Sequence, residues 1–218
     1  MKIIVCCEGS TDVGPITSLM KKCLPLHELD IDCRTHSELR KTTLLKSELP
    51  RGYNRESKRI NRIAYIRRLW HVANTSKSKH VGLHQDLGHQ DFQKVYQDIH
   101  KDFNVVLPSS VKRVSIVPKE MTESWLLADE NAYPSIPDEP KLPAKPEEIW
   151  GQKSDHQSNY PKNYFFRVLE QFRLSVNHDT YAEIAEKTDI EILKRCCPKS
   201  FGQFYADIQS FITKETTP

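Results

Sequence analysis

The stretch KIIVCCEGSTD, residues 2–12, decides how the rest of the chain is interpreted. Its first half is rich in β-branched and other apolar side chains, which predicts a short buried strand. Glu8 and Gly9 follow as a turn, and Ser10 or Thr11 is placed to cap a helix. A strand that passes through a turn into a helix is the repeating unit of α/β folds.

Strand and helix signals alternate through the first 130 residues. The expected strands cover residues 2–7, 29–34, 80–83 and 113–117. Helical periodicity covers residues 10–24, 55–73, 92–101 and 120–129. Strands separated by helices pair in parallel through right-handed crossovers. The sequence therefore predicts an α/β domain over residues 1–130, with a doubly wound, mainly parallel sheet of four strands.

The chain changes character after residue 130. Residues 131–162 hold six prolines, which favour an irregular arm lying over the sheet. Helical patterns follow at residues 164–174 and 190–212, the second interrupted near Pro198. We expect residues 131–218 to form an appended unit, a proline-rich arm and C-terminal helices packed on the α/β domain.

Composition narrows the classes of protein. Of the 218 residues, 38% are hydrophobic, and the mean hydropathy of −0.61 describes a very polar surface. No apolar run approaches the roughly 18 residues of a membrane-spanning helix, and the first residues become polar too early for a signal peptide. The six cysteines show neither a CxxC pair nor zinc-ligand spacing. We expect a cytoplasmic protein without a membrane partner.

The net charge of +3 conceals a basic segment. Residues 34–79 carry 13 Lys/Arg and three Asp/Glu, a local balance of +10. Such a segment could bind nucleic acid, although a solvated helix face explains the excess of basic residues equally well. The candidate phosphate-binding residues are Arg59, Arg62, Arg67 and Arg68 on the expected helix and Lys162, with Lys145 and Lys153, on the arm.

Acidic residues follow three of the expected strands. They are Glu8 with Asp12, Asp86 with Asp91, and Glu120 with Glu123. Functional groups of doubly wound sheets gather beyond the carboxyl ends of the strands. Converging carboxylates bind hard divalent cations such as Mg²⁺ or Mn²⁺. An acid in a first helical turn is also favoured by the helix dipole, so Asp12 has a purely structural alternative, and Asp91 is expected to be a helix cap.

We expect a metal site with Glu8, Asp12 and Asp86 as ligands. Glu123 is the fourth candidate ligand, and Glu120 competes with it from the same helix face. His84 precedes Asp86 by two residues and has an ordinary pKa near neutrality, so it is a candidate for proton transfer. Glu8, Asp86 and His84 are thus the candidate catalytic residues.

These motifs carry a resemblance that covers nearly the whole chain in order. Glu8-Gly9-Ser10-Thr11-Asp12 resembles the opening motif of Toprim domains. The set of this motif with the Arg-rich helix, Asp86, Glu123–Asp129 (ESWLLAD) and Cys197–Phe201 (CPKSF) resembles a bacterial Toprim-related family of unknown function, related to OLD-like nucleases. The resemblance implies a Toprim-like fold, a metal-dependent nuclease acting on DNA or RNA, and a role in anti-phage defence.

One residue departs from the Toprim pattern. Toprim nucleases usually present Asp-x-Asp at the second strand end, whereas this chain reads His84-Gln85-Asp86. The resemblance further implies an ABC-type ATPase partner, and a homo-oligomer is compatible with it. Because imidazole suits Mn²⁺, Fe²⁺ or Zn²⁺ better than Mg²⁺, the alternative is a non-catalytic Toprim-derived binding or assembly module with a degenerate metal site.

Overall fold

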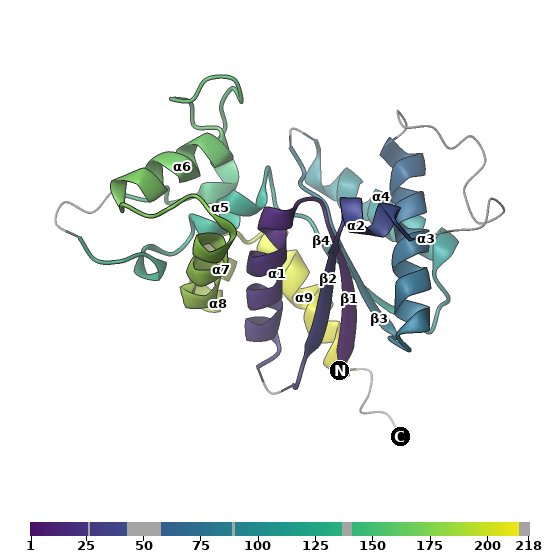
Figure 1. The fold of residues 1–218 in the computed structure, drawn as a ribbon. Coiled ribbons are helices and arrows are strands. Elements are labelled where there is room, and N and C mark those ends of the chain that lie inside the picture. Colours follow the sequence, from purple (N-terminus) through teal and green to yellow (C-terminus); the bar gives the residue numbers. More distant parts are fainter. Residues whose placement is uncertain (26, 43–57, 89, 137–140, 214–218) are drawn as a thin grey trace.

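A parallel sheet of four strands forms the centre of the structure (Figure 1). The computed structural model describes residues 1–218 except 26, 43–57, 89, 137–140 and 214–218, and gives the backbone alone for 58–60 and 212–213. The strands are β1 (Lys2–Cys7), β2 (Asp30–Thr35), β3 (His80–His84) and β4 (Lys112–Ile116). Their order is β2-β1-β3-β4, and every neighbouring pair is parallel. The α/β class with a four-stranded parallel sheet is confirmed.

Helices connect and follow the strands. In chain order they are α1 (Ser10–Cys23), α2 (His36–Arg40), α3 (Lys58–Thr75), α4 (Phe92–Val106), α5 (Thr122–Leu126), α6 (Pro161–Gln171), α7 (His178–Lys187), α8 (Ile190–Cys196) and α9 (Ser200–Thr213). Short 3₁₀ turns lie at η2 (Glu130–Ala132) and η3 (Pro146–Glu148). Among the described residues, no helix is both long and apolar enough to cross a membrane.

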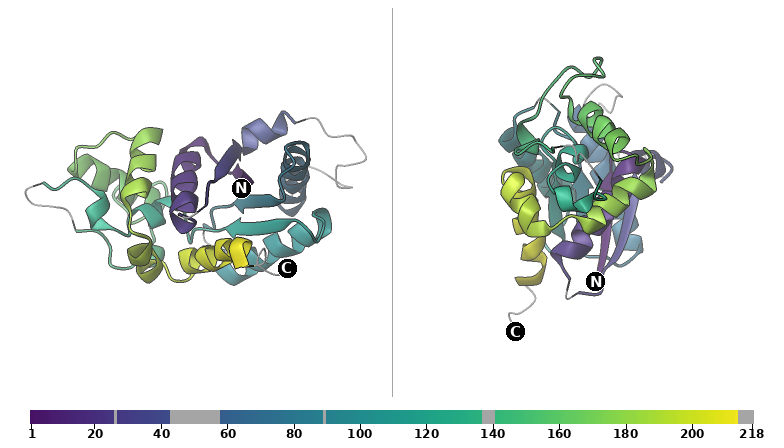
Figure 2. Two further views of the ribbon diagram at one scale, coloured as in Figure 1. Left: turned by 90° about the horizontal axis from the view of Figure 1, so that it is seen from below. Right: turned by 90° about the vertical axis from the view of Figure 1, so that its left-hand side faces the viewer.

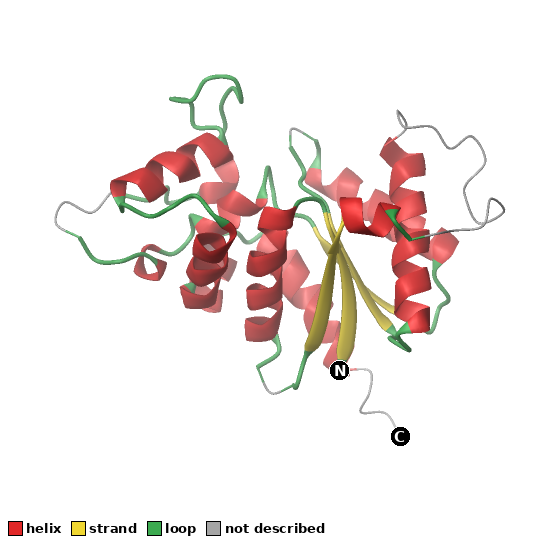
Figure 3. Cartoon of the chain, viewed as in Figure 1, coloured by secondary structure: helices red, strands yellow, loops and turns green. Residues whose placement is uncertain are grey.

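Helices cover both faces of the sheet (Figure 3). Side chains alternate along β1 because successive residues of a strand point to opposite faces. Ile3 and Val5 belong to the core under α1 and α9, whereas Ile4 and Cys6 belong to the core under α3 and α4. A strand buried on both faces reads as an unbroken apolar run, which explains why KIIVCC lacks a polar alternation.

The C-terminal half divides between two places. Helices α5 to α8 lie beyond α1, on the side away from α3, while α9 returns to the sheet beside β4 (Figures 1 and 2). Trp125, Phe165, Tyr181 and Phe201 share one apolar cluster with Ile3 of the first strand. The helices after residue 130 thus share the core of the sheet, and α9 is one of its covering helices.

The structure contains two helices that the sequence analysis did not predict. Thr35-x-x-Glu38 is a capping box that starts α2: the Thr35 hydroxyl accepts from the Glu38 N–H at 3.2 Å, and the Glu38 carboxylate accepts from the Thr35 N–H at 2.7 Å. Asn177 caps α7 in a similar way, through Thr180 N–H. The short length of α2 gave no periodic signal, and the apolar stripe of α7 is limited to Tyr181, Ile184 and Ala185.

Two predictions about helix caps have different outcomes. The prediction that Ser10 or Thr11 caps α1 is wrong, because Gly9 is the N-cap and its N–H donates to the Asp12 carboxylate at 3.0 Å. Asp12 must follow the turn by three residues to accept this bond, and that requirement sets the start of α1. The prediction that Asp91 caps a helix is confirmed, since its carboxylate accepts from the Lys94 N–H at 2.7 Å.

Gly14 lets α1 approach α7 closely. A Cβ atom placed on Gly14 would lie 2.7 Å from the Cβ of Ala182, a distance that forces one helix to move. A Cβ on Gly202 of α9, in contrast, meets nothing within 4 Å. Gly202 therefore serves as a control for Gly14, because both are helical but only Gly14 is in a close helix contact.

We predict that Gly14→Ala lowers the free energy of unfolding by about 1–3 kcal/mol through overpacking. Gly202→Ala should raise it by about 0.5–1 kcal/mol, because alanine loses less backbone entropy in a helix. Urea denaturation of both variants measures the difference. Equal stabilisation by the two substitutions would contradict the packing of α1 on α7.

Candidate metal centre

The candidate site lies where the winding of the sheet reverses. The chain passes from β1 to β2 on one side, and later elements are added beyond β3 on the other side. The carboxyl ends of β1 and β3 therefore form a topological switch point, the usual place of ligand sites in open α/β sheets. Glu8 directly follows β1, His84 ends β3, and Asp86 follows it by two residues.

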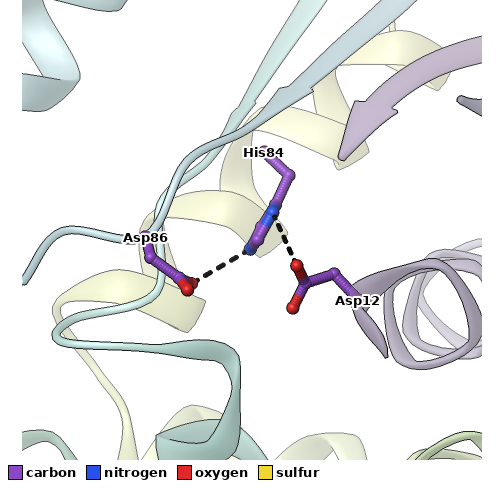
Figure 4. A group of neighbouring side chains, drawn as sticks. All are labelled: Asp12, His84 and Asp86. Atoms are coloured by element: carbon purple, nitrogen blue, oxygen red, sulfur yellow. Dashed lines mark ion pairs between the residues drawn. The ribbon is translucent and has the colours of Figure 1, made fainter. Parts of the chain in front are cut away.

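Three potential ligands meet at this point (Figure 4). Asp12, His84 and Asp86 each offer one ligand atom, and these atoms lie within 4.8 Å of one another. His84 stands between the two acids: its Nδ1 is 3.8 Å from Asp12 Oδ2, and its Nε2 is 3.3 Å from Asp86 Oδ1. The histidine is fully buried, Asp12 is buried and Asp86 is half-buried. This cluster could hold a metal ion.

Thr122 ties the three side chains together. Its hydroxyl donates to Asp12 Oδ1 at 2.8 Å and lies 3.0 Å from His84 Nε2, while its backbone N–H donates to Asp86 Oδ1 at 3.1 Å. Thr122 is the first residue of α5 and is itself buried. Sequence reasoning missed it because only charged groups were sought at the strand ends, although Thr122 lies between Glu120 and Glu123.

Glu8 contributes from the rim of the cluster. Its backbone nitrogen lies 3.4 Å from His84 Nδ1, and Glu8 is exposed and lines the same pocket as Asp86. Partial dehydration, and then the charge of Asp86, raise the pKa of Glu8 to about 7. Glu8 is thus beside the cluster of three, which Asp12, His84 and Asp86 form without it.

Glu123 and Glu120 differ in their relation to the cavity beside the cluster. Glu123 is buried in α5, where burial and then the charge of Asp86 raise its pKa to about 7. Lys162 lies near enough to lower that pKa, and the Tyr181 hydroxyl interacts with the Glu123 carboxylate. Glu120 is a pocket-lining residue with a left-handed backbone (φ 66°), and its carbonyl accepts from Gly88 N–H at 3.0 Å. Both glutamates are buried, but Glu120 belongs to the cavity lining and Glu123 does not.

The negative charge of the cluster sets the pKa of His84. Complete burial by itself lowers the pKa of an imidazole, but the negative charges of Asp12, Asp86 and Glu8 outweigh burial and raise the pKa of His84 to about 9. At neutral pH without metal, the site therefore contains an imidazolium among carboxylates. A metal ion that uses His84 as a ligand must displace this proton.

A pH-dependent stability follows. His84 titrates at about 6.5 when unfolded and at about 9 when folded, so its stabilising effect is complete below pH 6.5 and is lost as the pH rises through 9. The shift corresponds to a free energy on the order of 3 kcal/mol. We predict that the difference in unfolding free energy between wild type and His84→Gln shrinks from pH 6.5 to pH 9 in EDTA. Chemical denaturation at several pH values measures it, and a pH-independent difference would contradict the protonated state.

A cavity of about 670 Å³ opens in front of the cluster. His84, Asp86, Glu8 and Glu120 form one part of its lining. The other part is basic and aromatic and comes from α2 and α3, with His36, Arg40, Arg62 and Tyr65. Sequence reasoning missed His36, Arg40 and Tyr65, and the signal that could have found the first two is the Thr35–Glu38 capping box. Acids and arginines therefore share one pocket.

The predicted phosphate-binding residues occupy different surroundings. Arg62 lines the pocket, but its Nε and Nη2 both lie 2.6 Å from a carboxylate oxygen of buried Asp102, which binds α3 to α4. Arg67 and Arg68 are half-buried outside the pocket lining, and the side chain of Arg59 lies outside the described part of the chain. Lys162 is near Glu123 rather than in the pocket lining. The structure thus brings Arg62 alone of the described four to the pocket.

Comparisons with protein-family models, with curated proteins and with solved structures find no match for this chain. We therefore infer the function from the geometry of the site.

Proposed function

We propose that the chain is a divalent-metal-dependent, nuclease-like hydrolase that cleaves phosphodiester bonds in DNA or RNA. The observation that carries the proposal is the convergence of Asp12, His84 and Asp86 within 4.8 Å at the switch point of the sheet. His84 and Asp86 also line a cavity whose lining includes Arg40 and Arg62. Ligands for a cation beside groups that favour a phosphate are what phosphodiester cleavage requires.

The residues at the site have two proposed roles, metal ligand and proton acceptor. Asp12 and Asp86 supply carboxylate oxygens and His84 an imidazole nitrogen, a donor set that suits Mn²⁺ or another transition metal better than Mg²⁺. A bound divalent ion supplies an activated water and neutralises phosphate charge. Glu8 lines the cavity, and its pKa, raised to about 7 by partial dehydration and then by the charge of Asp86, suits it to accept a proton from a water near neutral pH.

The family-level proposals depend on the sequence resemblance alone. They comprise membership of the Toprim-related family with its fold, a role in anti-phage defence, an ABC-type ATPase partner and homo-oligomers. The order of the parallel sheet and the position of Glu8 after β1 are compatible with them. A cytoplasmic location is proposed from the composition of the sequence instead.

A non-catalytic module is the second candidate, and His84 favours it. Both ring nitrogens of His84 already face a carboxylate, Asp12 Oδ2 at 3.8 Å from Nδ1 and Asp86 Oδ1 at 3.3 Å from Nε2. With its pKa raised to about 9 by the surrounding carboxylates against the effect of burial, the imidazolium balances part of their charge without any metal. A chain of this kind would bind or assemble through the pocket and cleave nothing.

We predict that wild type binds Mn²⁺ and cleaves nucleic acid in its presence, and that Asp86→Asn abolishes both. Calorimetry with Mn²⁺ and cleavage assays on single-stranded DNA, duplex DNA and structured RNA measure these activities. Glu8→Gln should retain most metal binding and lose cleavage, because Glu8 lies beside the three-ligand cluster. Asp30→Asn is the control: it removes one carboxylate at the other end of the sheet, where Asp30 pairs with Lys2.

The result also separates the two candidates. Wild type and Asp86→Asn that are equally unable to bind Mn²⁺ and to cleave every substrate would establish the non-catalytic candidate. Equal loss in Asp30→Asn would attribute the effect to net charge instead of the site.

His84 should set the metal preference. We predict that wild type works with Mn²⁺ at lower concentration than with Mg²⁺, and that His84→Asp reverses this order, because a third carboxylate favours the harder ion. Activity titrated against each metal gives the ratio of the two half-saturating concentrations. An unchanged ratio would show that His84 is not a ligand.

A further inference from the structure

An aromatic and basic group of residues shares the cavity lining with the acidic cluster. The ring of His36 stacks on Tyr65, with centroids 3.9 Å apart and planes 5° from parallel. Arg40 Nε donates to the Tyr65 hydroxyl at 2.6 Å, and the guanidinium lies 5.7 Å from the centre of the tyrosine ring. His36 and Arg40 are four residues apart on α2, so one helical turn presents both to the cavity. We call these three residues the α2–α3 wall.

Arg40 lines this cavity with a guanidinium whose two Nη groups are available to a ligand. Its one hydrogen bond uses Nε, and among the described residues its two Nη groups have no hydrogen-bond partner. Arg62, in the same lining, commits Nε and Nη2 to buried Asp102. A guanidinium that lines a cavity and is held in place through Nε has both Nη groups available to bind two oxygens of one phosphate.

The size of the cavity limits what reaches this wall. A volume of about 670 Å³ lies within the range of about 300–1,000 Å³ for sites that enclose small ligands. A nucleotide with its base unpaired can enter such a cavity, whereas a base pair within a duplex is held in the stack. The half-buried ring of His36, supported by the buried ring of Tyr65, offers an aromatic surface on which bases of any sequence stack.

We propose that the α2–α3 wall is a nucleotide subsite: Arg40 binds a phosphate next to the cleaved one, and the His36–Tyr65 stack receives an unpaired base. The proposal rests on the proposed function for the cleaved phosphate, and it names the substrate class as single strands or frayed ends. Tyr65 is a positioning residue in this arrangement, since it holds Arg40 through Nε and supports His36 from behind.

Binding without metal tests the subsite independently of catalysis. The probe is a fluorescent single-stranded DNA octamer in EDTA, titrated with the full chain at several salt concentrations. Arg40→Gln should weaken binding by about tenfold and reduce the slope of log K against log salt by about 0.7, the effect of one lost phosphate contact on a single strand. Lys41→Gln is the matched control, because Lys41 is exposed next to Arg40 and lies outside the cavity lining.

Two more variants divide the phosphate contact from the base contact. Tyr65→Phe keeps the stacking ring and removes the acceptor for Arg40 Nε, so it should weaken binding less than Arg40→Gln while leaving the salt slope unchanged. His36→Ala should abolish the preference for the octamer over an abasic octamer of equal charge. Thermal unfolding of each variant checks that the fold is retained.

Equal binding by Arg40→Gln and Lys41→Gln would overturn the proposal, as would duplex DNA that binds as tightly as the single strand. A wild-type chain that binds no octamer overturns it as well. Loss of octamer binding in Arg40→Gln, in a chain that takes up no Mn²⁺ and cleaves nothing, would support the subsite and refute the proposed function.

Discussion

Mutual repulsion among carboxylates at one end of the sheet is the constraint around which this structure is built. Asp12, Asp86 and Glu8 meet there because parallel strands deliver their carboxyl ends to the same edge. Such a group of charges is stable only with a positive partner. His84 supplies it in the metal-free chain, since the surrounding charges, against the effect of burial, raise its pKa to about 9. A divalent cation would supply more positive charge at the same place, so the proton on His84 and a metal ion compete for this site.

The rest of the fold holds these charges in place. Asp12 is fixed by its bond to Gly9 N–H at the start of α1, and α1 in turn is set against α7 at Gly14. Thr122 positions the two aspartates and the histidine from the start of α5. Trp125 of the same helix is buried and donates to Ser200 Oγ at 2.7 Å. The helices after residue 120 are therefore part of the support of the site as well as of the core.

The sequence predicted the strands and most helices because each carries a local signal. IIVCC is an unbroken apolar run, RVSIV is rich in β-branched side chains, and α4 has a regular apolar face. It also predicted the meeting of Asp12 with Asp86, since a parallel sheet forces strand ends together. It did not reveal Thr122 or Arg40, because a hydroxyl or a free guanidinium becomes informative only when its neighbours in space are known. Nor did it show that Arg62 is bound to Asp102, a residue 40 positions away.

The central claim is that the Asp12–His84–Asp86 cluster binds a divalent ion. Anomalous diffraction from crystals soaked in Mn²⁺ above pH 7 tests it most directly, because it locates the ion without reference to activity. The account predicts one anomalous peak within about 2.0–2.6 Å of an Asp12 oxygen, an Asp86 oxygen and a ring nitrogen of His84. A map without a peak at the cluster, in which His84 still bridges the two acids through its ring nitrogens, would contradict it.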